Sequence, residues 1–126
     1  MNNVKIKIGG ANRVIRFGLK PLGDCIEHYN NEVDKFLVAL ERNPFKAVPL
    51  LFYYGLKWGS ENEGKIPDFT ENDVFIWLEE LPKGIQDEVV TSTIQLFLRS
   101  VYDNVPTVKE FVDKMDDESK KNLIGV

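Results

Sequence analysis

Cysteine and histidine are almost absent from this chain of 126 residues, which holds one of each, Cys25 and His28. A single cysteine excludes an internal disulfide, so the fold does not depend on an oxidising compartment. No run of about 18 apolar residues is present, which excludes a membrane-spanning helix. Residues 1–8 lack the apolar core of a signal peptide, so we expect a cytoplasmic location.

The scarcity of these residues also limits the chemistry that the chain can perform. Cys25 and His28 would lie one helical turn apart, but a nucleophilic pair needs a third, orienting group, and a metal site needs three or four ligands. We expect Cys25 to pack beside apolar residues and His28 to lie at the surface. The sequence predicts no catalytic, cofactor-binding or metal-ligating residue, and no enzymatic activity.

Charge is distributed unevenly along the chain. Residues 1–20 carry five cations and no acids, whereas the remainder carries eleven cations and twenty acids, a net charge of −9. Such an acidic body argues against nonspecific binding of nucleic acid, whose affinity depends on phosphate contacts. The N-terminal cations either contact an acidic partner or cover the solvent side of short strands.

The first residues alternate between apolar and polar side chains, as a half-buried strand does. Val4, Ile6 and Ile8 form the apolar set, and residues 9–12 (Gly-Gly-Ala-Asn) supply a turn before a returning strand over residues 13–17. The sequence therefore predicts a β-hairpin over residues 4–17. Two strands alone are marginally stable, so the hairpin must pack on helices or join another sheet.

From residue 22 the apolar spacing changes to three and four, which is typical of amphipathic helices. One apolar stripe runs from Leu22 to Leu40 and predicts a single helix, or two helices if Asn30-Asn31 interrupts it. Asn43-Pro44 begins the next helix, in which Pro49 lies in the first turn or starts a new helix, and residues 60–68 form a polar loop.

Three further helices are expected beyond the loop. Thr70 caps the first, Pro82 and Gly84 separate it from a longer second, and Thr107 caps the last. We therefore expect one domain over residues 1–126, mainly α with a short N-terminal β-hairpin (α+β). It comprises the hairpin (4–17), a helical body (20–115) and a charged tail (116–126) that frays.

Aromatic residues gather on the helix that begins at Pro44 and occupy more than one of its sides. A helix that is apolar all round is either buried completely or contacts a partner, and aromatic residues dominate protein interfaces. The sequence leaves both alternatives open for this cluster. The candidate partner-contact residues are Phe45, Phe52, Tyr53, Tyr54 and Trp58.

Several short motifs follow one another in a characteristic order. Phe-Gly-Leu at residues 17–19 closes the hairpin, a proline-led segment at 44–56 ends in Tyr-Gly-Leu, and residues 70–78 read Thr-x-x-Asp-Val-x-x-Trp-Leu. Over about residues 4–102 the chain resembles the tail assembly chaperones of long-tailed bacteriophages and prophages. That resemblance implies a protein without catalytic residues or cofactors.

The resemblance implies that the chain binds the helical tape measure protein, keeps it soluble, and is displaced as tail-tube subunits polymerise. Such a chaperone acts in the bacterial host cytoplasm and is not retained in the virion, with no nucleic acid or membrane partner; self-association is left open. The family also suggests a longer, frameshifted form, for which the codons of residues 120–122 (Lys-Lys-Asn) could supply a slippery run.

Two other classes of protein remain as alternatives. A structural tail component or another phage assembly protein would use the hairpin for sheet addition in an oligomer. A small regulatory, antitoxin-like domain is disfavoured, because no expected helix after residue 20 has a basic face.

Overall fold

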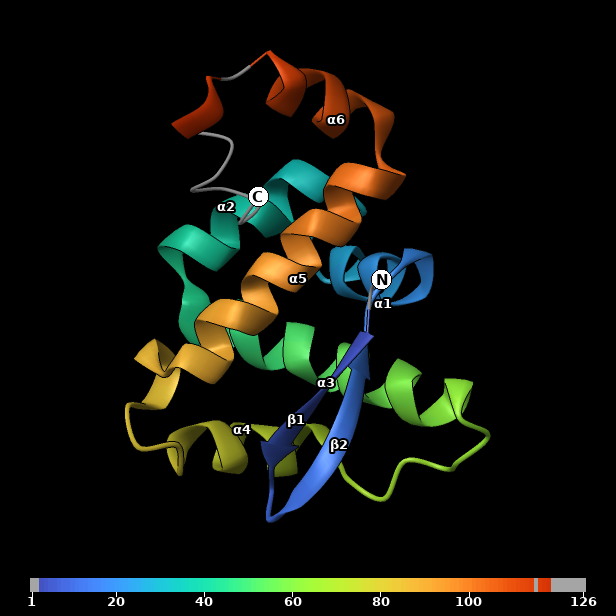
Figure 1. Ribbon diagram of the computed structural model, residues 1–126, viewed down its shortest axis with the longest axis vertical. Helices are drawn as coiled ribbons and strands as arrows, with labels where there is room; N and C mark the ends of the chain where they lie inside the picture. Colours follow the sequence, from blue (N-terminus) through green and yellow to red (C-terminus); the bar gives the residue numbers. More distant parts are fainter. Residues whose placement is uncertain (1–2, 115, 119–126) are drawn as a thin grey trace.

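The computed structural model describes residues 3–114 and 116–118. It consists of a two-stranded antiparallel hairpin followed by six α-helices and one short 3-10 helix within that described part, as Figure 1 shows. The predicted α+β class, mainly helical with an N-terminal hairpin, is confirmed. Residues 119–126, which include most of the expected frayed tail and the Lys-Lys-Asn segment, lie outside the described residues.

The hairpin is formed by β1 (Asn3–Ile8) and β2 (Ala11–Arg16), with Ile8 opposite Ala11. Its turn is tighter than the expected turn over residues 9–12, because only Gly9 and Gly10 stand between the strands. Both glycines have positive φ, 62° and 73°. A two-residue turn that matches the twist of the strands needs this conformation, and glycine adopts it at little steric cost.

The expected helix over residues 22–40 is two helices, as the alternative reading of Asn30-Asn31 proposed. Helix α1 (Leu19–Glu27) and helix α2 (Val33–Arg42) are separated by Asn30 and Asn31, which both adopt left-handed φ values, 58° and 59°. Asparagine is one of the few non-glycine residues that tolerate this conformation. The chain therefore turns at this point, while the apolar spacing continues across the break.

Helix α3 (Pro44–Asn62) is the central helix of the fold. It begins at Pro44 as predicted, but Pro49 lies inside it, neither in the first turn nor at a new start. Proline has no backbone N–H, so the Phe45 carbonyl loses its partner in the helix. The helix continues to Asn62, which shortens the predicted loop over residues 60–68 at its N-terminal end.

The second half of the chain adds helices at two sides of α3. The Thr70 cap is confirmed as a capping box: the Asp73 N–H donates to Thr70 Oγ1 and the Thr70 N–H donates to the Asp73 carboxylate. The Thr107 cap is wrong, because Pro106 takes the first helical position and Val105 precedes it. The elements are α4 (Glu71–Glu79), η1 (Gly84–Gln86), α5 (Glu88–Asn104) and α6 (Pro106–Asp113).

The core lies where the hairpin, α3 and α5 meet. Phe17 at the end of the hairpin packs edge-on against Phe97 of α5 at 5.4 Å between ring centroids, and Phe97 packs in the same way against Phe36 of α2. Figure 1 shows α5 crossing in front of α2, with α6 folded back at its far end. Within the described residues, no helix has the length and apolar character needed to cross a bilayer.

Candidate functional site

The only cysteine and the only histidine of the sequence do not form a reactive pair. Cys25 is completely buried, and desolvation raises the pKa of its thiol far above the ordinary value, so the thiol stays protonated. His28 is exposed, and its Nε2 lies 2.9 Å from the hydroxyl of Tyr54. Both residues have the environments that the sequence predicted, because Cys25 packs in the core and His28 lies at the surface.

Two acidic residues near helix ends accept hydrogen bonds from backbone N–H groups and so cap the helices. Asp73 belongs to the capping box of α4, and Asp87 caps α5 by accepting a hydrogen bond from the Val89 N–H. In the part of the chain that the structure describes, no group of three or more His, Cys, Asp or Glu side chains could hold a metal ion.

The five aromatic residues proposed as partner contacts have different environments. Phe52 is completely buried, so it belongs to the core and offers no surface to a partner. Tyr53, Tyr54 and Trp58 are half-buried and make contacts inside the chain. Tyr53 packs edge-on against Phe69, Tyr54 meets His28, and Trp58 lies 4.9 Å below the Lys20 ammonium. Burial raises the pKa of the Tyr54 hydroxyl.

Phe45 is the one member of the cluster that lies open on the surface, with 71% of it exposed. It borders a small hollow of about 330 Å³ between α3, α4 and η1, which includes Pro49, Phe75 and Ile85. The sequence left open whether the aromatic cluster belongs to the core or to a partner surface, and the answer differs from residue to residue. Phe52 is core, Phe45 is surface, and the other three rings lie between these extremes.

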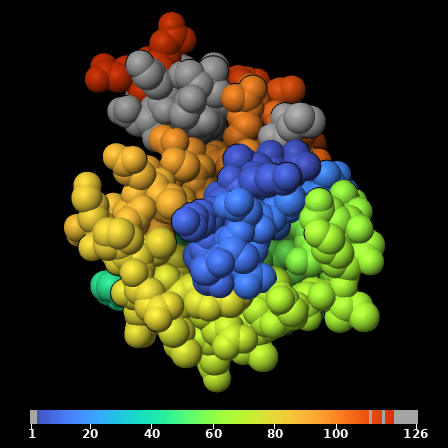
Figure 2. All heavy atoms as spheres, turned by 60° about the horizontal axis from the view of Figure 1, so that its bottom comes forward, coloured from blue at the N-terminus to red at the C-terminus, as the bar shows by residue number. Residues whose placement is uncertain are grey.

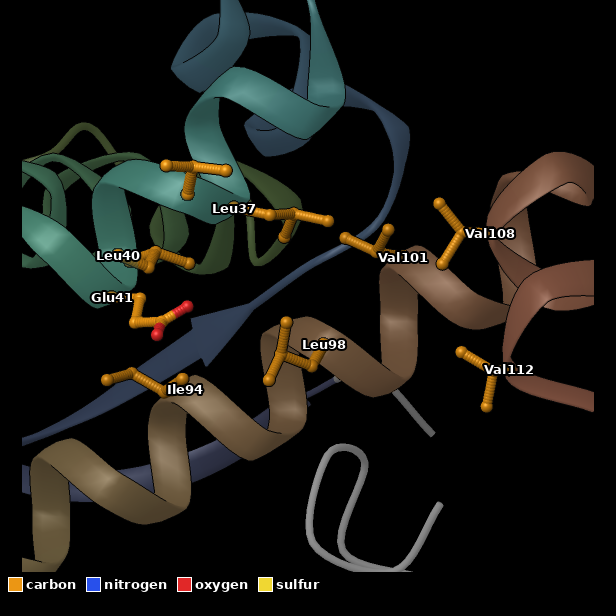
Figure 3. Close-up of a pocket in the computed structure, with 9 residues that line it drawn as sticks. Leu37, Leu40, Glu41, Ile94, Leu98, Val101, Val108 and Val112 are labelled. Atoms are coloured by element: carbon orange, nitrogen blue, oxygen red, sulfur yellow. The ribbon is translucent and has the colours of Figure 1, made fainter. Parts of the chain in front are cut away.

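A larger apolar groove lies elsewhere, between α2, α5 and α6. Its volume is about 400 Å³, and eight of its nine lining residues are apolar. We call it the α2/α5/α6 groove. Figure 3 shows side chains of α2 and α5 facing each other across it, with α6 at one end. The lining residues are Leu37, Val38, Leu40, Glu41, Ile94, Leu98, Val101, Val108 and Val112.

Each wall of the groove comes from an amphipathic helix whose apolar stripe is wider than its contact with the core. Phe36 fills the core from α2, and its neighbours Leu37 and Leu40 remain half-buried. Val38 is 50% exposed on the rim. The hydroxyl of Tyr102 on α5 donates a hydrogen bond to the Asp113 carboxylate on α6. This bond holds α6, which closes one end of the groove, against α5.

The apolar spacing of the sequence places six groove residues on buried helix stripes and leaves Leu37 and Val38 outside them; the six are Leu40, Ile94, Leu98, Val101, Val108 and Val112. The apolar spacing identifies which face of each helix turns inward, but it does not give the distance between facing helices. One signal was present: Leu37 and Val38 lie beside the stripe that runs through Phe36 and Leu40, and they widen the apolar face of α2.

The lining of the groove is almost entirely apolar. Glu41 is its single ionisable lining residue, and it lies at the end between α2 and α5 (Figure 3). An acid–base reaction needs a second positioned group, which the lining does not supply. The volume falls within the range of about 300–1,000 Å³ that is usual for binding pockets. Compared with known proteins, the chain matches no protein-family model, no curated protein and no solved structure.

Proposed function

We propose that this protein is a tail assembly chaperone of a long-tailed phage or prophage, which binds and solubilises the helical tape measure protein. The α2/α5/α6 groove is the observation that carries the proposal. A long helical client exposes apolar stripes until tail-tube subunits surround it. A groove walled by Leu, Ile and Val side chains can cover such a stripe, and the motif order at residues 17–19, 44–56 and 70–78 supports the same family.

The shape and the lining of the groove favour a helix as the ligand. An amphipathic helix inserts apolar residues at positions i, i+3, i+4 and i+7 into a groove of this kind, and its polar face stays in water. Glu41 at one end favours a client helix with a basic residue next to its apolar stripe. The net charge of −4 supports solubility of the complex through charge repulsion.

The proposal includes the place of action. A chaperone of this kind works in the bacterial host cytoplasm and leaves the client before the particle is complete. A structural tail component, the alternative function, would remain in the particle. Mass spectrometry of purified virions separates the two: the chaperone is absent, whereas a structural component is present in stoichiometric amount.

Co-expression tests the groove itself. The partner is the product of the neighbouring long reading frame, which should encode a largely helical protein. Val38 in the groove and Ile76 on α4 are equally exposed, 50% and 51%, so Val38→Glu and Ile76→Glu form a matched pair. We expect the unchanged chain and the Ile76→Glu variant to keep the client in the supernatant, and the Val38→Glu variant to leave it in the pellet.

Circular dichroism of each purified variant shows that the substitution has not unfolded the chain. If Val38→Glu is folded and still keeps the client soluble, the groove does not bind it. If the unchanged chain leaves the client insoluble, the proposed function itself is wrong.

A further inference from the structure

The two edges of the hairpin sheet are treated differently by the fold. The outer edge of β2 is covered by α3, where Gly59 lies against the backbone carbonyl of Val14 and leaves no room for a side chain. No strand of the described chain pairs with the outer edge of β1. An uncovered edge presents unpaired N–H and C=O groups to which another chain can add a strand.

The register identifies the backbone groups at this edge. In an antiparallel pair, every second residue turns its N–H and C=O away from its partner strand. With Ile8 opposite Ala11 next to the two-residue turn, those residues on β1 are Asn3, Lys5 and Lys7. The Val14 carbonyl, opposite Lys5, correspondingly points outward on β2 and meets Gly59.

The side chains at the β1 edge are positively charged. Lys5 and Lys7 are exposed, and neither ammonium has an ion-pair partner among the described residues. Two other cations of the N-terminal unit are paired, Arg13 with Asp68 and Lys20 with Glu61. The charge that is free at the edge therefore comes from lysines that flank the unpaired backbone groups.

An open hollow of about 520 Å³ lies between β1 and α5. Its apolar lining includes Val4 and Ile6 from the strand, and Val89 and Leu96 from the helix. Thr93 on α5 also lines it, and the buried Thr93 hydroxyl has no hydrogen-bond partner in the described structure. Figure 2 shows the hairpin, in blue, at the surface beside the yellow and orange segments that include α5.

We propose that the β1 edge and this hollow bind an extended partner segment in which acidic and apolar residues alternate, added as a third strand. In an added strand, alternate side chains point to opposite faces of the sheet. Acidic side chains on one face would lie beside Lys5 and Lys7, and apolar side chains on the other would enter the hollow next to Val89 and Leu96. Lys5 and Lys7 line the hollow from β1 and Glu88 lines it from α5, so an acid of the partner is attracted to the lysines at the strand edge and repelled from the α5 side.

Lysines make a second copy of this chain an unsuitable occupant. Pairing β1 with β1 of another copy would bring lysine side chains of the two strands close together, and like charges across a strand pair are destabilising. The site also lies on different elements from the α2/α5/α6 groove except for α5, so the proposal does not depend on the function assigned to that groove.

A designed peptide tests the proposal with the full chain. The probe is a capped peptide as long as β1 that alternates glutamate and valine, and the control peptide has lysine in place of glutamate. Addition of a strand should slow hydrogen exchange at the outward amides of Lys5 and Lys7 in NMR spectra. The amides of Ile6 and Ile8 already face β2 and should change less.

Charge reversal supplies the second measurement. The double variant Lys5→Glu/Lys7→Glu should weaken binding of the acidic peptide by about tenfold, because it replaces attraction between surface charges by repulsion. Lys46→Glu/Lys83→Glu makes the same charge change on exposed lysines elsewhere and should bind as the unchanged chain does.

Three results would overturn the proposal. The first is that the acidic peptide does not bind the unchanged chain, and the second is that it binds without slowing exchange at Lys5 and Lys7. The third is that these amides exchange slowly without peptide and that their exchange slows further as the protein concentration rises. A second copy of the chain would then be the occupant.

Discussion

Thr93 and Arg16 each bury a polar side-chain atom that has no hydrogen-bond partner within the described part of the chain. Thr93 is 1% exposed on the inner side of α5, where its hydroxyl has lost water and gained no replacement. A buried donor or acceptor without a partner costs about 1–3 kcal/mol. Ser100, which lies further along α5, is also buried, but its hydroxyl oxygen lies 3.4 Å from the side-chain amide nitrogen of Asn104.

Replacement of the Thr93 hydroxyl should therefore stabilise the protein. Valine keeps the branched shape of threonine and removes the polar group, so we expect Thr93→Val to raise the free energy of unfolding by about 1 kcal/mol. Urea unfolding measures this change, with an unaltered m-value as the sign of an unaltered unfolded state. Ser100→Ala, the control, should lower stability. A loss of stability in Thr93→Val would mean that the hydroxyl has a partner in solution.

The aromatic residues of α3 show how far sequence reasoning reaches for single side chains. The spacing indicates that Phe52 and Tyr54 lie on different sides of one helix, and that is correct. It does not indicate which side meets another element, because this depends on contacts with residues far away in the chain. Phe52 is enclosed by the core, whereas the hydroxyl of Tyr54 lies within hydrogen-bond distance of His28 at the end of α1.

At the scale of elements, α3 and β2 approach each other unusually closely. Gly55 and Gly59 lie one helical turn apart on the side of α3 that faces β2. A methyl group at Gly55 would overlap the side chains of Ile15 and Phe17, and one at Gly59 would overlap the Val14 carbonyl. Side chains can adjust, whereas a backbone carbonyl in a paired strand cannot move without disturbing the hairpin.

This close approach predicts that Gly59→Ala destabilises the protein by about 2–3 kcal/mol, as overpacking against a fixed neighbour does. Gly23 in α1 is a matched control, because nothing lies within 4 Å of the position that its Cβ would take. Gly23→Ala should stabilise by about 0.5–1 kcal/mol through helix propensity alone. Thermal unfolding of both variants measures the contrast, and equal melting temperatures would show that α3 does not contact β2 at Gly59.

Boundaries set by local chemistry were more predictable than those set by the rest of the fold, although the Thr107 cap was wrong. The Thr70 cap depends on residues within one turn of the chain and is confirmed, and the turn of the hairpin begins at Gly9 as predicted but ends two residues earlier than expected. The interior position of Pro49 was missed because tertiary packing stabilises a helix that proline alone would break. The α2/α5/α6 groove was missed for a related reason, since helix spacing is a property of the assembled core.

At the scale of the whole molecule, positive charge is concentrated at the N-terminus, and part of it is neutralised by the acidic body. The Arg13 guanidinium forms an ion pair with Asp68 at 3.0 Å and lies 4.3 Å from the centre of the Trp77 ring. These two contacts hold the hairpin against α4 and the loop before it. Lys20 pairs with Glu61 near the end of α3. The remaining N-terminal cations are Lys5, Lys7 and Arg16, against a net charge of −9 in the residues that follow.

This distribution of charge predicts that the protein does not bind DNA. Affinity for duplex DNA arises from the number of phosphates that a protein contacts, and three cations on a small hairpin can neutralise few of them. The acidic body of the protein repels the other phosphates of the DNA. On a column of immobilised duplex DNA at about 50 mM salt, where nonspecific binding is strong, the protein should elute in the flow-through. Retention that is lost when Lys5 and Lys7 are changed to glutamate would instead identify the β1 edge as a phosphate-binding surface, and it would favour the regulatory alternative.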